Sequence, residues 1–302
     1  MTSTAPLVET APAKVNLTLR VLGRRADGYH DLESLVAFAD IGDTLRLTPG
    51  DGLTLSVRGP NAAAAGPDAD NLVLKAAAAL AASIVGVRLG AFELEKTLPV
   101  AAGLGGGSAD AAAALRLLAR ANELRGDDVR LYEAACATGA DVPVCLEPRV
   151  RVMRGVGEIL SAPLDLAPLP AVLVNPGVAV ATKDVFARWS PAAAPAPLFD
   201  WSAIGAIANR DQVLRLLSYQ PNDLEAPAVA VAPAIAETLA ALRALSGCRL
   251  ARMSGSGATC FALFANAAEA ILAAQTLSVR HPQWWVRAGA LGGVFGGAFG
   301  GG

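Results

Sequence analysis

The residues that most restrict the fold of this chain are the glycines between Pro99 and Ala114, in the sequence Pro-Val-Ala-Ala-Gly-Leu-Gly-Gly-Gly-Ser-Ala-Asp-Ala-Ala-Ala-Ala. Gly103 and the run from Gly105 to Gly107 allow backbone angles that other residues rarely adopt, so the segment can form a tight loop with exposed N–H groups. The alanines after Ser108 favour a helix, and Ser108 and Asp110 suit its first turn. A glycine loop that leads into a helix N-terminus binds anions. A simple turn could also be glycine-rich, but four glycines within five residues favour a phosphate site.

Two common phosphate-binding motifs fail to match this loop. The P-loop requires a lysine followed by Ser or Thr after its last glycine, but Gly107 is followed by Ser108 and Ala109. The dinucleotide fingerprint requires a third glycine three positions after the second, where this chain has Ser108. The pattern Pro-x-x-x-Gly-Leu-Gly-Gly-Gly-Ser-x-Asp-Ala resembles instead the central motif of the GHMP kinase superfamily of small-molecule kinases.

The composition indicates a folded protein with a large core. Of the 302 residues, 53% are hydrophobic and 17% charged, and the formal net charge of −2 argues against a general nucleic-acid binder. The four cysteines (Cys136, Cys145, Cys248 and Cys260) form no Cys-x-x-Cys pair, and there are only two histidines, so we expect free, buried thiols and no zinc site. No export signal or membrane-spanning segment is recognisable, which leads us to expect a cytoplasmic protein without a membrane partner.

The N-terminal part of the chain alternates in polarity as a strand does. In residues 14–21 apolar and polar side chains alternate at every position, which predicts a half-buried strand. Lys14 and Asn16 project to the same side of such a strand, roughly 7 Å apart. From the pattern alone, this polar side faces water. Asp27-Gly28 then predicts a hairpin turn into a strand over residues 32–41.

The segments before the glycine loop predict a second hairpin and a helix. Strands over residues 44–48 and 53–58 flank Pro49-Gly-Asp-Gly52, which favours a hairpin between them. Asn71 suits the cap of a helix that runs to Ile84. A strand over residues 91–96 leads to the loop, and the helix after the loop is expected to end near Asn122.

A second rigid bend follows at Gly139-Ala-Asp-Val-Pro143. Gly139 suits the C-terminus of a helix over residues 131–137, and Pro143 is expected to hold Val142 in an extended conformation. Asp141 is thereby fixed between two elements. Such an Asp often only hydrogen-bonds its own turn, but a rigid bend also suits a catalytic carboxylate.

The second half of the chain predicts strands and helices in an α+β arrangement with a mainly antiparallel sheet. The Pro- and Leu-rich segment 160–170 is expected to cross into it, Asn222–Glu225 to start a helix, and Gly289–Gly302 to be mobile. The other expected helices cover residues 182–189, 202–217, 233–245 and 267–277, and the expected strands cover residues 171–175, 249–253, 258–264 and 284–288.

Further motifs extend the resemblance to most of the chain, from residue 11 to residue 261. The segments Ala-Pro-Ala-Lys-Val-Asn-Leu and Arg-Ala-Asp-Gly-Tyr-His-Asp-Leu resemble the opening of one group within the GHMP superfamily, and Met-Ser-Gly-Ser-Gly-Ala-Thr-Cys-Phe matches its third motif. The resemblance implies an α+β, two-domain GHMP kinase fold. Its N-terminal domain, like domain 2 of ribosomal protein S5, would cover residues 1–160, a ferredoxin-like C-terminal domain residues 161–288, and a glycine-rich tail residues 289–302.

The resemblance implies an ATP-dependent kinase that acts on a hydroxyl of a polyol carrying cytidine diphosphate. Asp141 would accept the proton of that hydroxyl, and Lys14 would orient the hydroxyl and neutralise charge on the γ-phosphoryl group. A neighbouring ammonium makes Asp141 a weak base, which is tolerable if the transition state is loose and the proton leaves late.

The resemblance also implies the nucleotide site. The expected ATP-binding residues are Asn71, Lys96, Pro99, Gly103, Leu104, Gly105, Gly106, Gly107, Ser108, Ala109, Ser254, Gly255, Ser256 and Gly257. Asn71 and Lys96 stand where the family lines its adenine pocket, although a helix cap and a solvated lysine are simpler explanations. Ser108 is a candidate Mg²⁺ ligand, although its hydroxyl could cap the helix instead. ATP and Mg²⁺ are therefore the expected cofactors.

The cytidine end of the substrate is expected to meet aromatic residues. Tyr29 and Phe186 can sandwich a pyrimidine ring, and His30 can hydrogen-bond the edge of the base. Thr182 lies one helical turn before Phe186, and Asn16 is expected on the substrate side. Without the resemblance, Phe186 would be assigned to the core and His30 to a turn. The expected partner is thus a small molecule with a cytidine diphosphate group, and the chain is expected to be a monomer or a weak homodimer.

The chain departs from the family pattern at two positions. Ala102 stands where Gly is common, and Ala109 stands where a second Ser is common, so no role of that hydroxyl is transferred. Three alternatives stay open: a GHMP kinase for homoserine, mevalonate or a sugar, an ATP-dependent decarboxylase of the diphosphomevalonate type, and a non-catalytic nucleotide sensor. The Asp-Gly-Tyr-His turn weighs against the first, and the presence of both Lys14 and Asp141 weighs against the last.

Overall fold

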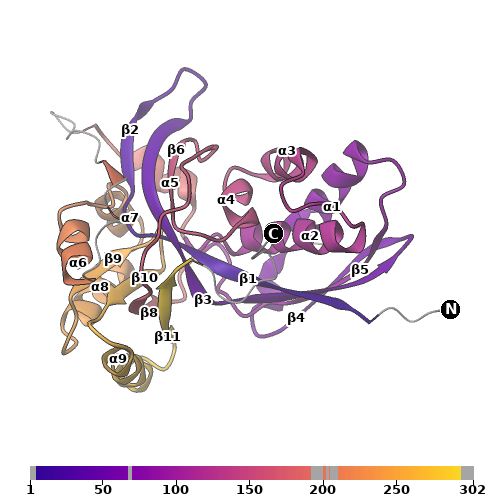
Figure 1. Ribbon diagram of the computed structural model, residues 1–302. Coiled ribbons are helices and arrows are strands. Elements are labelled where there is room, and N and C mark those ends of the chain that lie inside the picture. The colour runs from indigo at the N-terminus through magenta and orange to yellow at the C-terminus, as the bar shows by residue number, and fades with distance from the viewer. Residues whose placement is uncertain (1–4, 67–69, 192–199, 202–203, 205–209, 294–302) are drawn as a thin grey trace.

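The computed structural model describes residues 5–66, 70–191, 200–201, 204 and 210–293. Within these ranges the strands form one mixed sheet in the order β4-β5-β3-β11-β8-β10-β9, with β1, β2 and β6 also paired to β3, and β7 paired to β6 (Figure 1). The strands are β1 (Leu7–Asn16), β2 (Arg20–Arg24), β3 (His30–Gly50), β4 (Leu53–Arg58), β5 (Leu89–Glu95), β6 (Arg151–Gly155), β7 (Ile159–Leu160), β8 (Leu169–Asn175), β9 (Leu250–Met253), β10 (Cys260–Leu263) and β11 (Trp285–Gly292).

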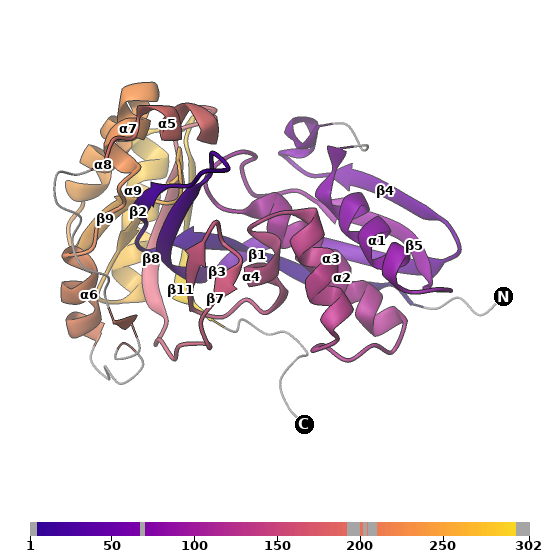
Figure 2. The same cartoon turned by 90° about the horizontal axis from the view of Figure 1, so that it is seen from above.

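The helices cover the sheet in two groups, one on each half of the molecule (Figures 1 and 2). The described helices are α1 (Leu72–Ser83), α2 (Gly106–Ala121), α3 (Val129–Thr138), α4 (Val142–Leu146), α5 (Thr182–Arg188), α6 (Arg210–Ser218), α7 (Glu225–Val231), α8 (Ala234–Arg243) and α9 (Ala267–Arg280), with a short 3₁₀ helix at Ala62–Ala65. Helices α1 to α4 pack beside β1, β3, β4 and β5, whereas α8 and α9 pack on β8 to β11. This arrangement confirms the predicted α+β class.

The long strand β3 connects the two halves of the molecule. It pairs with β1 and β5 near its C-terminal end, with β2 and β6 near its N-terminal end, and with β11 in between. The predicted strands 32–41 and 44–48 are therefore parts of one strand of 21 residues. Strands from before and after residue 160, where the two domains were predicted to meet, belong to the same sheet.

The predicted hairpin between residues 44–48 and 53–58 is wrong. Strand β5 lies between β3 and β4, pairing antiparallel with β3 and parallel with β4. The turn at Pro49-Gly-Asp-Gly52 reverses the chain, but the two strands that it joins are not neighbours in the sheet, because one strand lies between them. Local turn composition predicts a reversal and cannot predict which strand fills the space beside it.

The predicted strand over residues 14–21 is interrupted, and its polar side is not wet. Strand β1 ends at Asn16 and β2 begins at Arg20. Both the apolar and the polar side chains of this segment are less than 10% exposed, because Lys14 pairs with Asp141, the side chains of Asn16 and Thr18 hydrogen-bond β3, and the backbone contacts a turn in the second half of the chain. The Asn16 N–H donates to Ser254 Oγ at 3.1 Å, and Arg252 donates to the Leu17 carbonyl at 2.7 Å.

Two helix starts differ from the predictions. Helix α2 begins at Gly106, after Gly105 with φ +59°, and no side chain caps it. Ser108 lies in its first turn, as predicted, whereas Asp110 lies beyond that turn. Val142 is helical rather than extended, because Pro143 occupies the first turn of α4, where its missing N–H costs nothing. Asn71 caps α1 as predicted, accepting a hydrogen bond from the Val73 N–H at 3.0 Å.

The C-terminal strand is longer than predicted. Residues Gly289–Gly292 belong to β11, so the expected mobile tail cannot begin at Gly289. Residues 192–199, most of the first part of the helix expected over 202–217 and the tail from residue 294 fall outside the described residues. Helix α7 begins at Glu225, as expected from Asn222–Glu225. In the described ranges, no helix is long and apolar enough to cross a membrane.

Candidate active site

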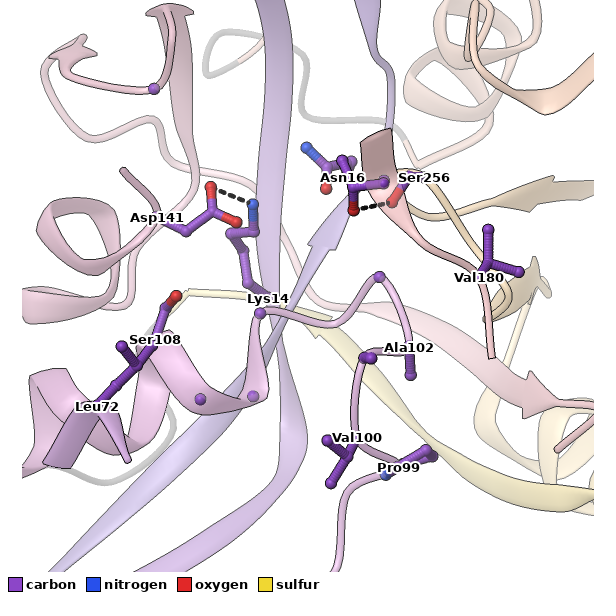
Figure 3. Close-up of a pocket in the computed structure, with 18 of the residues that line it drawn as sticks. Lys14, Asn16, Leu72, Pro99, Val100, Ala102, Ser108, Asp141, Val180 and Ser256 are labelled. Carbon is purple, nitrogen blue, oxygen red and sulfur yellow. Dashed lines mark hydrogen bonds and ion pairs between the residues drawn. The ribbon is translucent and has the colours of Figure 1, made fainter. Parts of the chain in front are cut away.

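A cavity of about 530 Å³ lies where the glycine loop and the start of α2 meet both halves of the sheet. Its walls come from the end of β1, the loop 99–107, the start of α4, the start of α5 and the turn 254–257. The close-up in Figure 3 shows the loop curving around one side of the cavity while Lys14 and Asp141 face each other on another. Segments far apart in the sequence therefore build one site.

Lys14 and Asp141 form an ion pair at the cavity wall. The distance from Lys14 Nζ to Asp141 Oδ1 is 2.8 Å, and the side chains are 5% and 40% exposed (Figure 3). Lys14 is held on β1, where its backbone N–H donates to the Leu104 carbonyl of the glycine loop at 2.8 Å. Asp141 directly precedes α4, and its side chain makes no capping hydrogen bond, so its carboxylate is available to the cavity. The pair can orient a hydroxyl group and accept its proton.

The glycine loop needs glycine at two positions for steric reasons. At Gly103, with φ +74°, a Cβ atom would lie 2.4 Å from the Ser254 carbonyl oxygen. At Gly105, with φ +59°, it would lie 3.2 Å from the Lys14 side chain. The loop thus packs between the turn at Ser254 and Lys14 and then enters α2, whose first N–H groups have no intrahelical acceptor and can bind an anion.

The turn 254–257 packs directly against the glycine loop at Gly103. Ser254 is fully buried, and its hydroxyl accepts from the Asn16 N–H and donates to the Gly103 carbonyl at 2.8 Å, so it connects β1 to the loop. Ser256 lines the cavity and shares a hydrogen bond of 2.8 Å with Thr182 at the start of α5. The turn therefore contacts both the expected nucleotide side and the expected substrate side.

Lys96 is buried between two carboxylates rather than solvated. Its Nζ lies 2.5 Å from Asp43 Oδ2 and 2.6 Å from Asp110 Oδ2. Burial disfavours the charge on Lys96, but the carboxylates of Asp110 and Asp43 outweigh this effect and raise its pKa. Burial, helped by Asp43 and opposed by Lys96, raises the pKa of Asp110 to about 7. Both shifts follow from two acids sharing one ammonium in the protein interior.

The expected cytidine-binding residues only partly come together. The rings of His30 and Phe186 stack at 4.7 Å with an interplanar angle of 22°, and Trp189 meets His30 edge-on. Burial and the charge of Arg24 lower the pKa of His30, which favours a neutral imidazole. Tyr29 is 66% exposed and does not line the cavity, so in this structure His30, not Tyr29, stacks on Phe186.

Most of the predicted site residues line the cavity. They are Lys14, Asn16, Asn71, Lys96, Pro99, Gly103, Gly105, Gly106, Gly107, Ser108, Asp141, Thr182, Phe186, Gly255 and Ser256. The others lie behind or beside this wall, and they are Leu104, Ala109, Ser254, Gly257, Tyr29 and His30. Ala109 is 1% exposed, so a hydroxyl at this position would be buried under the helix start.

Sequence reasoning missed three polar residues of the site. Asp43 is fully buried in β3, Ser34 lines the cavity and accepts from Asn16 Nδ2 at 2.7 Å, and Asp110 faces Lys96 instead of capping α2. The sequence offers no signal that separates Asp43 from Asp40, an exposed acid three residues earlier in the same strand.

The described residues contain no group of three His, Cys, Asp or Glu side chains that could hold a metal ion. All four cysteines, which lie in the described part of the chain, are free; Cys145 and Cys260 are buried as predicted, whereas Cys136 is exposed and Cys248 half-buried. A divalent cation at this site would therefore depend on few protein ligands.

The geometry matches the needs of phosphoryl transfer, which depends on anion binding and on the positioning of an acceptor hydroxyl. With this fold, the site defines a small-molecule kinase of the GHMP class. Family models agree: the GHMP kinases N terminal domain matches residues 71–147, and the GHMP kinases C terminal domain matches residues 193–279.

Comparison with individual proteins narrows the class. The 4-diphosphocytidyl-2-C-methyl-D-erythritol kinase of Methylorubrum extorquens is 59% identical over 282 residues, covering 93% of this chain and 97% of that kinase. The crystal structure of a 4-(cytidine 5'-diphospho)-2C-methyl-D-erythritol kinase is 36% identical, with a TM-score of 0.78, over 95% of this chain and 100% of that one. The homoserine kinase of Cytophaga hutchinsonii, 21% identical with a TM-score of 0.70 over 97% of each chain, shares the fold. The chain belongs to the 4-diphosphocytidyl-2-C-methyl-D-erythritol kinase family, and is a kinase, as the sequence motifs predicted.

Proposed function

We propose that this chain transfers the γ-phosphoryl group of ATP to the 2-hydroxyl of 4-diphosphocytidyl-2-C-methyl-D-erythritol, in the non-mevalonate route to isoprenoid precursors. The observation that carries the proposal is the Lys14–Asp141 pair, 2.8 Å apart, on the wall of the cavity that the glycine loop also lines. Family membership supports the reaction, since the relatives bear the name of this kinase. The products are the 2-phosphate and ADP.

In this proposal, Asp141 accepts the proton of the 2-hydroxyl and Lys14 holds that hydroxyl in line with the phosphoryl group. The carboxylate is 40% exposed, so a substrate hydroxyl can reach it from the cavity. The ammonium of Lys14 is buried, and in this proposal it stabilises the negative charge of the transferred group. A loose transition state leaves little covalent work for the protein, so positioning and charge account for the catalysis.

The phosphate chain of ATP is proposed to lie on the start of α2. Gly105, Gly106 and Gly107 leave this helix N-terminus open on the cavity side, and a Cβ on Gly107 would only touch Leu72 at 3.5 Å. Unpaired N–H groups and the helix dipole stabilise the negative charge there. Asn71 and Pro99 line the same cavity and support a place for adenine at its side.

Mg²⁺ fits this site as a cation bound mainly by the nucleotide. The Ser108 hydroxyl lines the cavity at the start of α2, and oxygen atoms are the ligands that Mg²⁺ prefers. Mg²⁺ in nucleotide sites usually binds one or two protein oxygens together with substrate phosphates and water. When bound, it would neutralise charge between the phosphates.

The cytidine group is proposed to bind beside α5. The stacked pair of His30 and Phe186 offers an aromatic surface, and a neutral His30 can donate and accept hydrogen bonds at the base edge. Thr182 and Asn16 line the cavity between this surface and Asp141. For Tyr29 to cover the base from the other side, its exposed side chain would have to turn toward Phe186.

The proposal also covers the partners, the oligomeric state and location, and the domain limits of the chain. The substrate is a small molecule, and neither nucleic acid nor a membrane is a partner, which the net charge of −2 supports for nucleic acid. We propose a monomer or weak homodimer in the cytoplasm. Domain limits at residues 160 and 288 are proposed as well, with β3 and β11 joining the two parts.

A coupled assay of ADP release tests the function. The chain is offered ATP and Mg²⁺ with the cytidine-diphosphate polyol, the bare methylerythritol phosphate, homoserine or mevalonate. We expect ADP release with the first substrate only. Equal use of the bare polyol would remove the case for a cytidine site, activity on homoserine or mevalonate alone would indicate a different GHMP kinase, and CO₂ released with ADP from diphosphomevalonate would indicate a decarboxylase.

A further inference from the structure

A buried trio of charged side chains lies beneath the glycine loop. Asp43, Lys96 and Asp110 come from β3, from the end of β5 and from α2, and each is less than 5% exposed. The ammonium of Lys96 has three N–H donors, of which one goes to Asp43 Oδ2 at 2.5 Å and another to Asp110 Oδ2 at 2.6 Å. We call these three residues the Lys96 trio.

Asp43 also binds the backbone where the loop starts. Its Oδ1 accepts the N–H of Thr97 at 2.6 Å and the N–H of Leu98 at 2.8 Å. The Thr97 hydroxyl donates to the Gly42 carbonyl at 2.8 Å and lies 3.3 Å from the same Asp43 oxygen. Both oxygens of this fully buried carboxylate are thus used, one for the loop backbone and one for Lys96.

The trio lies directly under the start of α2. A Cβ on Gly106 would be 3.2 Å from Lys96 Nζ and 3.7 Å from Asp43 Oδ2. Asp110, one turn further along the same helix, holds Lys96 from the other side. The loop over residues 97–105 is therefore tied at both of its ends to one side chain of β3, directly at its start and through Lys96 at its end.

We propose that Asp43 is a positioning residue for the nucleotide, which fixes the glycine loop against the start of α2 through Lys96 and through the backbone of Thr97 and Leu98. The inference rests on the proposed use of ATP and adds a residue that does not itself reach the ligand. Asp43 lies outside the cavity lining, so its effect must pass through Lys96 and the loop.

The kinetic constants kcat and KM distinguish this role from a general contribution to folding. Loss of folded protein lowers the amount of active enzyme, which reduces the apparent kcat and leaves both KM values unchanged. A displaced glycine loop weakens nucleotide binding and leaves the polyol site beside α5 as it was. A rise in KM for ATP alone is therefore the signature of the positioning role.

The test variant is Asp43→Asn, which keeps the size of the side chain and removes its charge. We expect KM for ATP and the dissociation constant for ADP to rise about tenfold, as for one lost hydrogen bond to a charged group, with KM for the polyol unchanged. The matched control is Asp51→Asn, in the exposed turn after the same strand, which should change neither value. ADP affinity is measured by calorimetry without the polyol, so this result stays interpretable if the polyol proves not to be the substrate.

A double variant shows whether Asp43 acts through Lys96. If it does, Asp43→Asn combined with Lys96→Met weakens ADP binding less than the sum of the two single changes, because both remove the same contact. Full additivity would contradict this path. Should Asp43→Asn not yield folded protein, Thr97→Val removes the neighbouring hydroxyl contacts and should raise KM for ATP alone by about threefold, as expected for one neutral hydrogen bond.

Two results would overturn the proposal. In the first, KM for ATP and ADP affinity stay at the wild-type values in folded Asp43→Asn. If that variant does not fold, the same result in Thr97→Val would overturn the proposal. In the second, KM for ATP and KM for the polyol rise together, which would indicate a distortion of the whole site. Absence of polyol turnover in the wild type together with weakened ADP binding in Asp43→Asn would instead refute the proposed function and leave the role of Asp43 standing.

Discussion

Replacing Asp141 by Asn tests the catalytic pair with the smallest possible change. Asp141 lies before α4 and makes no capping hydrogen bond, so the helix loses nothing when its carboxylate becomes an amide. The amide oxygen of Asp141→Asn can still accept a hydrogen bond from Lys14, but it cannot take a proton from a hydroxyl. The variant therefore separates chemistry from structure.

The expected effect on the catalytic rate is much larger than the expected effect on the free energy of unfolding. A general base contributes about 10²- to 10⁴-fold to the rate, which corresponds to roughly 3–5 kcal/mol of transition-state stabilisation. The ion pair with Lys14 involves a carboxylate that is 40% exposed, so its loss should lower the free energy of unfolding by about 1 kcal/mol or less. We expect kcat to fall at least a hundredfold, about 2.7 kcal/mol, with little change in stability.

The assay is coupled ADP release at saturating ATP, together with ADP binding by calorimetry and unfolding in urea. ADP affinity should equal that of the wild type, because the phosphates bind on α2 rather than on Asp141. Asp165→Asn, an ion-paired carboxylate that is 91% exposed, serves as the control and should retain full activity. A kcat for Asp141→Asn above about a tenth of the wild-type value would refute the role of Asp141 as the base.

Three further changes follow from contacts in and around the site. Phe186→Ala removes the aromatic surface that stacks with His30 and should raise KM for the cytidine substrate about tenfold, as expected for one lost base–aromatic contact, with KM for ATP unchanged; an equal rise for ATP would contradict the assignment. Gly103→Ala places a Cβ 2.4 Å from the Ser254 carbonyl at φ +74° and should lower kcat/KM for ATP by about tenfold or more in steady-state assays, whereas wild-type values would show that the loop tolerates displacement. Arg116→Met breaks a buried ion pair with Glu9 and removes hydrogen bonds to three carbonyls, so unfolding in urea should show a loss of about 3 kcal/mol; a loss below about 1 kcal/mol would mean that the pair adds little.

The local elements of the site could be predicted because their causes are local. Asn71 precedes an apolar helix and caps it, and the alanines after Gly107 form α2 because few residues favour a helix more. The turn at Asp27-Gly28 joins β2 to β3 as predicted, with φ +90° at Gly28. Lys14 and Asp141 were predicted to act together only because of the resemblance to the family motifs. No local sequence pattern relates the two residues.

Contacts between distant segments could not be predicted in this way. Strand β5 lies between β3 and β4 because it pairs with both, although it is distant from them in the sequence. Nothing in the turn before β4 predicts this pairing. Asp43 and Lys96 are 53 positions apart, and a buried lysine has the same appearance in a sequence as a solvated one. The polar side of residues 14–20 was expected to face water because the partners of its side chains, such as Asp141 for Lys14 and Ser34 for Asn16, lie in other segments.

The central claim is that the cavity transfers a phosphoryl group to a hydroxyl of a cytidine-diphosphate polyol. Phosphorus NMR of a reaction with ATP, Mg²⁺ and 4-diphosphocytidyl-2-C-methyl-D-erythritol tests it most directly. The account predicts one new phosphomonoester signal, on the 2-oxygen, that grows in step with ADP while both diphosphate signals of the substrate persist. ADP that accumulates with inorganic phosphate and no phosphomonoester would contradict the claim.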